Sequence, residues 1–148
     1  MDFYYHITEK DWPDRIKLNP RIVGRNRSPW ESRLPRICVC PTPWHCLISI
    51  PRPISKLFVF RTLRQCKVER PDGILDAHVT LEGWRTKPTS FVKVNEIDLE
   101  VIEQMDLLKV VGTVWAIERQ RQALERAKSI YITRYGERHE HTSFIRSA

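Results

Sequence analysis

The chain has 148 residues, of which 41% are hydrophobic and 29% are charged, as expected for one globular domain with its own core. No run of about 18 apolar residues is present to span a bilayer and the first residues lack the pattern of a secretory signal, so we expect a cytoplasmic protein. Lys and Arg outnumber Asp and Glu by 25 to 18, and a basic protein of this kind attracts polyanions or acidic partners without specifying which.

The first 63 residues contain several short segments that favour strands. The segment FYYHIT at 3–8 is predicted to be a buried strand. Four prolines break residues 9–35 into turns and short extended pieces, and an irregular segment of this length is usually functional or disordered. Residues 36–40 and 56–63 are predicted to be strands, with a short helix that has Pro43 at its first position.

The remainder of the chain changes from strand patterns to helical ones. Residues 64–75 are polar and include an RPDG turn, and residues 91–102 supply one long strand or two short ones. From 103 onward apolar residues recur three or four positions apart, although Gly112 weakens the case for one unbroken helix. We therefore expect an α+β protein: a compact, mostly antiparallel core in 1–102, a helical extension in 103–135 packed on it, and a flexible tail in 136–148.

The four cysteines raise the question of a zinc site. Cys38, Cys40 and Cys46 lie close together with His45, and Cys66 follows later. Structural zinc sites usually place ligands in two separated pairs, and this chain has no second pair. We predict reduced thiols and no metal.

Several catalytic signatures are absent from the sequence. It contains no glycine-rich phosphate loop and no G-x-S-x-G turn. Arginines are instead concentrated in the first half, and the irregular segment interleaves them with an aromatic residue. The candidate contacts for nucleic acid or a partner there are Arg25, Arg27, Trp30 and Arg33.

An ordered set of short motifs carries a resemblance. YHIT near the start, PRICVCPTPWHCL in the middle and T-x-E-x-W at 80–84 resemble a family of small, mostly phage-borne, uncharacterised proteins, over about residues 4–102. That family plan is in turn distantly similar to the ADP-ribosyltransferase fold, in which two sheets are split around the site. The resemblance implies NAD as cofactor and a host macromolecule as the substrate.

The resemblance also implies roles for individual residues. Glu82 and His6 would be catalytic, Glu82 at the hydroxyl of the nicotinamide ribose and His6 at the adenosine-side ribose. Tyr4, Trp44 or Trp84 would stack on the nicotinamide ring, and Arg36 or Arg21 would clamp the pyrophosphate. The candidate cofactor-binding residues are His6, Thr8, Arg21, Arg36, Thr42, Trp44 and Trp84.

The chain differs from the transferase pattern at two positions. Its middle motif offers one hydroxyl, Thr42, and Thr80 stands where protein-modifying members often carry a second glutamate or a glutamine. A second class of function therefore stays open: a non-catalytic basic protein that binds nucleic acid, or a phage-type inhibitor of a host nucleic-acid enzyme or defence complex. Under that alternative, His6, Glu82 and Trp84 are ordinary strand, turn and core residues.

Overall fold

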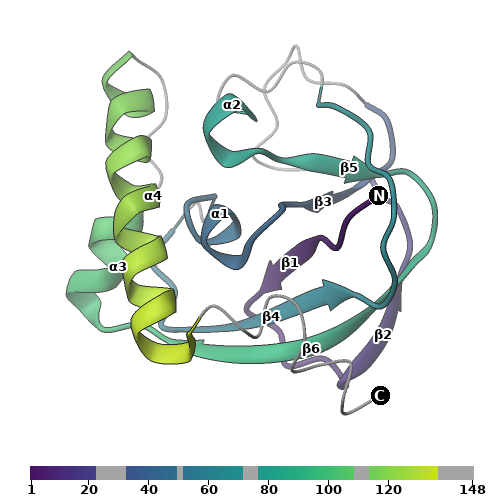
Figure 1. Cartoon of the computed structure of the whole chain (residues 1–148), viewed down its shortest axis with the longest axis horizontal. Helices are drawn as coiled ribbons and strands as arrows, with labels where there is room; N and C mark the ends of the chain where they lie inside the picture. Colours follow the sequence, from purple (N-terminus) through teal and green to yellow (C-terminus); the bar gives the residue numbers. More distant parts are fainter. Residues whose placement is uncertain (23–32, 50–51, 72–76, 109–113, 137–148) are drawn as a thin grey trace.

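The computed structural model describes residues 1–22, 33–49, 52–71, 77–108 and 114–136. These residues form six strands and four helices, shown in Figure 1. In chain order the elements are β1 (Tyr5–Thr8), β2 (Arg15–Leu18), β3 (Ile37–Val39), α1 (Pro43–Leu47), β4 (Lys56–Thr62), α2 (Ala77–Thr80), β5 (Gly83–Arg85), β6 (Thr89–Asp98), α3 (Val101–Leu107) and α4 (Val114–Tyr135). None of these helices is both long and apolar enough to cross a membrane.

The strands form two separate antiparallel sheets. The larger sheet has the order β1-β4-β6-β2, and the smaller sheet pairs β3 with β5. An isolated bridge pairs Tyr5 of β1 with Cys40, which directly follows β3, with backbone N···O distances of 2.8 and 2.9 Å. A second isolated bridge pairs Arg21, beyond β2, with Arg36, directly before β3. In Figure 1 the small sheet lies above β1, while α3 and α4 stand together at one end of the molecule.

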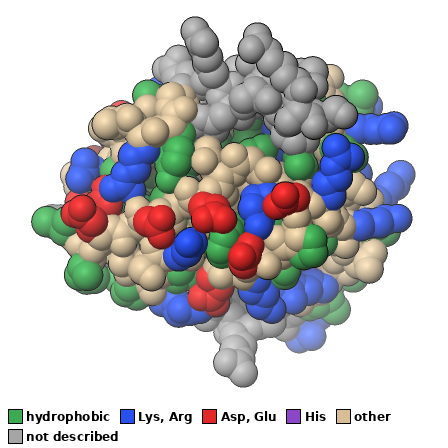
Figure 2. Space-filling view, turned by 90° about the horizontal axis from the view of Figure 1, so that it is seen from below, with side chains coloured by type: hydrophobic (Ala, Val, Ile, Leu, Met, Phe, Trp, Pro, Cys, Tyr) green, Lys and Arg blue, Asp and Glu red, His purple; other side chains and the backbone are tan. Residues whose placement is uncertain are grey.

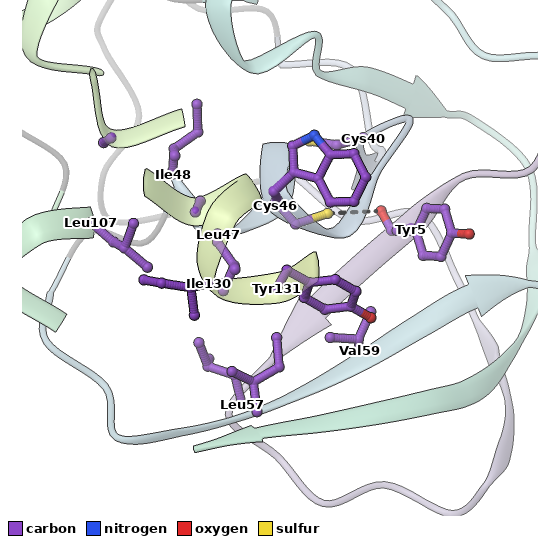
Figure 3. Close-up of a cluster of buried hydrophobic side chains, with 14 of the residues drawn as sticks. Tyr5, Cys40, Cys46, Leu47, Ile48, Leu57, Val59, Leu107, Ile130 and Tyr131 are labelled. Carbon is purple, nitrogen blue, oxygen red and sulfur yellow. Dashed lines mark hydrogen bonds between the residues drawn. The ribbon is translucent and has the colours of Figure 1, made fainter. Parts of the chain in front are cut away.

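Both faces of β4 are buried, which explains its unbroken apolar sequence. Leu57 and Val59 face a main cluster that also contains residues of α1 and α4, and Figure 3 shows Leu47, Ile130 and Tyr131 meeting there. Because side chains alternate along a strand, Phe58 and Phe60 point the other way. They form a second cluster, under β3, with Ile37, Val39 and Phe91.

Helix α1 is fixed by its first turn. Thr42 is its N-cap: the side-chain hydroxyl accepts a hydrogen bond from the backbone N–H of His45 at 3.2 Å, and Pro43 follows at the first helical position. The helix then buries Trp44, Cys46 and Leu47. The Cys46 thiol donates to the backbone oxygen of Tyr5 at 3.3 Å, drawn as a dashed line in Figure 3, so α1 is tied to β1.

Much of the predicted secondary structure is confirmed. The α+β class with antiparallel sheets, the strands near 3–8, 36–40 and 56–63, and the helix beginning at Pro43 are all present. Residues 91–102 contain one strand, β6, rather than two, and α3 begins at Val101, two residues before the predicted start of the helical part. The predicted flexible tail lies outside the described residues, apart from Gly136.

One of the short extended pieces expected in 9–35 is a paired strand, and residues 23–32 of that segment lie outside the described residues. Strand β2 pairs with β6 over Arg15–Leu18 and alternates between exposed and half-buried residues. A four-residue edge strand between Pro13 and Pro20 carries too little apolar sequence to be recognised alone, and its pairing with β6 defines it. Helix α2, a single turn, was also not predicted.

Candidate functional site

A hollow of about 530 Å³ lies beside Glu82, and we call it the Glu82 hollow. Three chain segments and the single residue Pro41 form it: the segments are the amino terminus, residues 66–70 and residues 81–83. Isolated bridges join these segments, Asp2 to Cys66 and Glu69 to Trp84. The twelve residues that line the hollow are Met1, Asp2, Tyr4, Pro41, Cys66, Lys67, Val68, Glu69, Arg70, Leu81, Glu82 and Gly83.

The lining of the hollow is mixed in chemistry. Asp2, Glu69 and Glu82 supply carboxylates, whereas Lys67 and Arg70 supply cations. The Tyr4 ring adds a flat surface that carries a hydroxyl group. Burial and then the charge of Asp2 raise the pKa of this hydroxyl, and Arg70 opposes them. The tyrosine therefore lies between an acidic side chain and a basic one.

Glu82 is held in place by its neighbours. Its Oε2 accepts a hydrogen bond from the indole Nε1–H of Trp84 at 2.7 Å, and its backbone N–H donates to the Thr80 hydroxyl at 3.3 Å. Trp84 is itself fixed, because the Arg36 guanidinium lies 4.1 Å from the centre of its ring. A carboxylate anchored at one oxygen keeps its orientation without help from a ligand, which is the preorganisation that electrostatic catalysis needs.

The other predicted key residue, His6, lies outside the Glu82 hollow. Its ring contacts Phe91 and stacks on Trp12, and its Nδ1 lies 2.8 Å from the backbone oxygen of Cys38. That carbonyl can only accept, so Nδ1 carries the proton and Nε2 is the acceptor nitrogen. Burial lowers the pKa of His6, the hydrogen bond to the Cys38 carbonyl opposes this, and the charge of Arg21 lowers the pKa further, so the net shift favours the neutral ring.

Cys38 lies between the two predicted catalytic residues. Its backbone oxygen binds His6, and its thiol faces Glu82 and Arg36. Because strand side chains alternate, this thiol is on the face of β3 opposite Ile37, whose side chain lies in the second cluster near the His6 ring. The structure therefore links His6 and Glu82 through β3 and does not bring them into one hollow.

The remaining predicted cofactor contacts are spread over the fold. Trp44 and Trp84 are 8% and 2% exposed, and Trp44 packs on Tyr131, so Tyr4 is the stacking candidate that lines the hollow. Arg36 is buried and donates to the Leu34 oxygen, while Arg21 is exposed and pairs with Arg36 through the backbone.

Two threonines among these candidates make local hydrogen bonds. The Thr8 hydroxyl accepts from the Lys10 N–H at 3.1 Å, and the Thr42 hydroxyl lies 2.6 Å from Nδ1 of His45 as part of the helix cap. Of the predicted partner-binding residues, Arg33 is exposed, whereas Arg25, Arg27 and Trp30 lie outside the described residues.

The cysteines are all free thiols, and the described part of the chain holds no cluster of three or more His, Cys, Asp or Glu side chains suited to a metal ion. Burial, and next the charge of Glu82, raises the pKa of Cys38 to about 12. A hydrogen bond with Cys46 and burial raise the pKa of Cys40. These side chains act as small apolar residues rather than nucleophiles.

The raised pKa values predict that the folded protein resists alkylation. The thiolate is the reactive form, so iodoacetamide at pH 8 should modify Cys38 and Cys40 at least about a hundredfold more slowly in the folded chain than in urea. Mass spectrometry of quenched samples measures both rates. Equal rates in the two states would show that these thiols are accessible and ionised in the folded protein.

Val68 leaves no space for a side chain at Gly83, which lines the hollow. A Cβ at this position would lie 2.6 Å from Cγ2 of Val68. We expect Gly83→Ala to cost about 1–3 kcal/mol of unfolding free energy, because the neighbouring Val68 is β-branched and lies between two bridged residues, Cys66 and Glu69, so it cannot move away cheaply. Urea denaturation of the single variants and of Val68→Ala/Gly83→Ala measures the coupling.

In the Val68→Ala background, Gly83→Ala should cost much less unfolding free energy than it costs in the wild-type protein, because the Cγ2 atom that the new Cβ would meet has been removed. Gly136→Ala is a useful control, since its Cβ would meet nothing within 4 Å and its cost arises from the backbone φ of 75°. If the losses of unfolding free energy in the two single variants simply add up in the double variant, a contact between Val68 and the new Cβ at position 83 is contradicted.

Comparison with known proteins gives no further guide to this site. No protein-family description, no curated protein and no solved structure matches the chain. The resemblance to ADP-ribosyltransferases therefore stays a prediction from the order of the sequence motifs. The sequence indicated Glu82 and Trp84 as site residues, but no motif indicated Lys67, Arg70 or Leu81. Bridges at Cys66 and Glu69 place the segment that contains Lys67 and Arg70 beside the hollow, and Leu81 lies there in a turn with a positive φ.

Proposed function

We propose that this protein binds NAD in the Glu82 hollow and transfers ADP-ribose to a macromolecule. The observation that carries the proposal is the carboxylate of Glu82, which lines a hollow of about 530 Å³ and is oriented by the Trp84 indole at 2.7 Å. Two separate antiparallel sheets connected by isolated bridges support the split-sheet arrangement that the resemblance implies.

The chemistry requires a negative charge where positive charge develops. When the bond between ribose C1′ and the nicotinamide nitrogen breaks, the electron pair leaves with nicotinamide and the ribose becomes oxocarbenium-like. Glu82 would accept a hydrogen bond from the ribose hydroxyl and stabilise that charge. The Trp84 hydrogen bond keeps the carboxylate from turning away, so little reorganisation is needed during the reaction.

The other groups of the hollow fit the rest of a dinucleotide. Tyr4 offers a ring for stacking, and Lys67 and Arg70 offer cations for the pyrophosphate. These two cations replace Arg36 and Arg21 in the proposal, because Arg36 is buried against Trp84 and neither residue lines the hollow. His6 is a positioning residue that holds β1 against β3 through the Cys38 carbonyl.

The experiment is incubation of the purified protein with NAD labelled on its adenylate part and a bacterial lysate. Label that becomes covalently attached to a protein or nucleic acid, with release of nicotinamide, supports the proposal and reports the class and size of the acceptor. NAD should also raise the melting temperature, because it binds the folded state. No transfer together with no thermal shift would overturn the proposal.

The second candidate is a basic protein that acts by binding alone. On the face seen in Figure 2, Asp and Glu side chains lie beside Lys and Arg side chains. Ion pairs such as Lys56–Glu96 and Lys93–Asp11 neutralise part of the basic charge. A surface of mixed charge is a poor match to a polyanion. This candidate therefore depends on Arg25, Arg27, Trp30 and Arg33, and stable capture of a lysate component without transfer is the outcome that would favour it.

A further inference from the structure

Leu81, at the wall of the Glu82 hollow, has an unusual backbone. Its φ is 53°, and no other non-glycine residue in the described ranges has a positive φ. In this left-handed region the Cβ of an L residue crowds the following carbonyl, so glycine or asparagine is the usual choice. A leucine here makes the fold less stable than a glycine would, unless its side chain compensates.

Packing within the described part of the chain does not supply that compensation. The leucine is 46% exposed and belongs to neither hydrophobic cluster. The turn itself is supported by other groups, because the Thr80 hydroxyl accepts the hydrogen bond from the Glu82 N–H, and Thr80 is buried. The side chain of Leu81 is thus half-exposed in the lining of the hollow, next to Glu82, and neither hydrophobic cluster accounts for a leucine at this position.

We propose that Leu81 is the specificity-determining residue of the hollow and packs on the nicotinamide ring of the bound dinucleotide. This inference rests on the proposed function. Leu81 and Tyr4 both line the hollow, and Leu81 directly precedes the carboxylate that would hold the attached ribose. The ligand class is therefore a flat heteroaromatic ring on a ribose, rather than a sugar phosphate alone.

The chemistry of the ring makes an apolar contact useful. The nicotinamide of NAD carries a positive charge that disappears as the glycosidic bond breaks, since the electron pair goes to the ring nitrogen. An apolar side chain packs on the flat ring in the bound dinucleotide and solvates the neutral leaving group better still than the cation. Leu81 therefore contributes to NAD binding and contributes more as the ring departs, and this increase is what accelerates a reaction.

The test separates folding from ligand contact by comparing wild type with Leu81→Gly and Leu81→Met. We expect Leu81→Gly to melt at or above the wild-type temperature, because glycine relieves the left-handed backbone. The same variant should bind NAD and nicotinamide mononucleotide about fivefold to tenfold more weakly in calorimetry and bind ADP-ribose, which lacks the ring, as wild type does. Leu81→Met keeps an apolar side chain and should bind all three ligands like wild type.

Each other result has a definite meaning. A lower melting temperature for Leu81→Gly would show that packing holds the leucine and would overturn the inference. If NAD and ADP-ribose lose affinity equally, the effect comes from the loop and not from a contact with the ring, and the inference is overturned. Unchanged NAD affinity in Leu81→Gly would overturn this inference alone, whereas a wild-type protein that binds none of the three ligands would overturn the proposed function as well.

Discussion

Glu82→Gln should abolish ADP-ribose transfer and leave NAD binding nearly intact. The amide keeps the size of the side chain, and its oxygen still accepts the Trp84 indole hydrogen bond seen at 2.7 Å. It lacks the negative charge that stabilises the ribosyl cation, so we expect transfer to fall at least about a hundredfold. Because the ground state depends little on that charge, NAD affinity should stay within about threefold of wild type. Transfer of labelled NAD and calorimetry measure the two quantities.

Glu69→Gln is the matched control for this variant. Glu69 lines the same hollow, and the substitution removes the same charge from a residue whose backbone pairs with Trp84. Glu69→Gln should keep most of the transfer activity, since Glu69 is not the residue expected to meet the ribose hydroxyl. If both variants lose activity equally, the total charge of the hollow matters and Glu82 has no special part in the reaction.

The core was more predictable from the sequence than the site. An unbroken apolar segment such as 57–60 indicates a strand buried on both faces, because its side chains alternate between two clusters. Pro43 after a threonine indicates the start of a helix for an equally local reason. Such signals lie within a few residues of one another, so no knowledge of distant contacts is needed to read them.

The hollow depends on contacts that leave no local pattern. Asp2 meets Cys66, and Glu69 meets Trp84, through single bridges between segments far apart in the chain. The backbone angle of Leu81 is likewise set by its surroundings. The same limit applies to the tryptophans: the sequence offers Trp44 and Trp84 as exposed platforms or as core residues with equal ease, and only their packing on Tyr131 and Arg36 separates the two.

The interaction of α4 with the sheets bears on the predicted division of the chain. The sequence predicts a core in 1–102 with helices added to it, whereas α4 contributes Ala127, Ile130 and Tyr131 to the main cluster, all of them at most 4% exposed. The Tyr131 hydroxyl accepts a hydrogen bond from the Asn95 amide on β6 at 3.1 Å. Residues 1–102 alone would leave this part of the main cluster uncovered, as Figure 3 makes visible.

Ile130→Asp should therefore unfold the whole protein, and not only its last helix. The substitution buries an unpaired carboxylate beside Leu47 and Tyr131 and removes apolar contacts, so we expect a loss of at least about 4 kcal/mol, a large part of the stability of a domain of this size. Ser129→Asp adds the same charge one residue earlier, on the exposed face of α4, and should change stability by less than about 0.5 kcal/mol. Circular dichroism in the far ultraviolet and thermal melting of both variants measure the outcome. If Ile130→Asp keeps its strand signal and a cooperative transition, the sheets form a stable unit without α4. The division at residue 102 is then a true domain boundary.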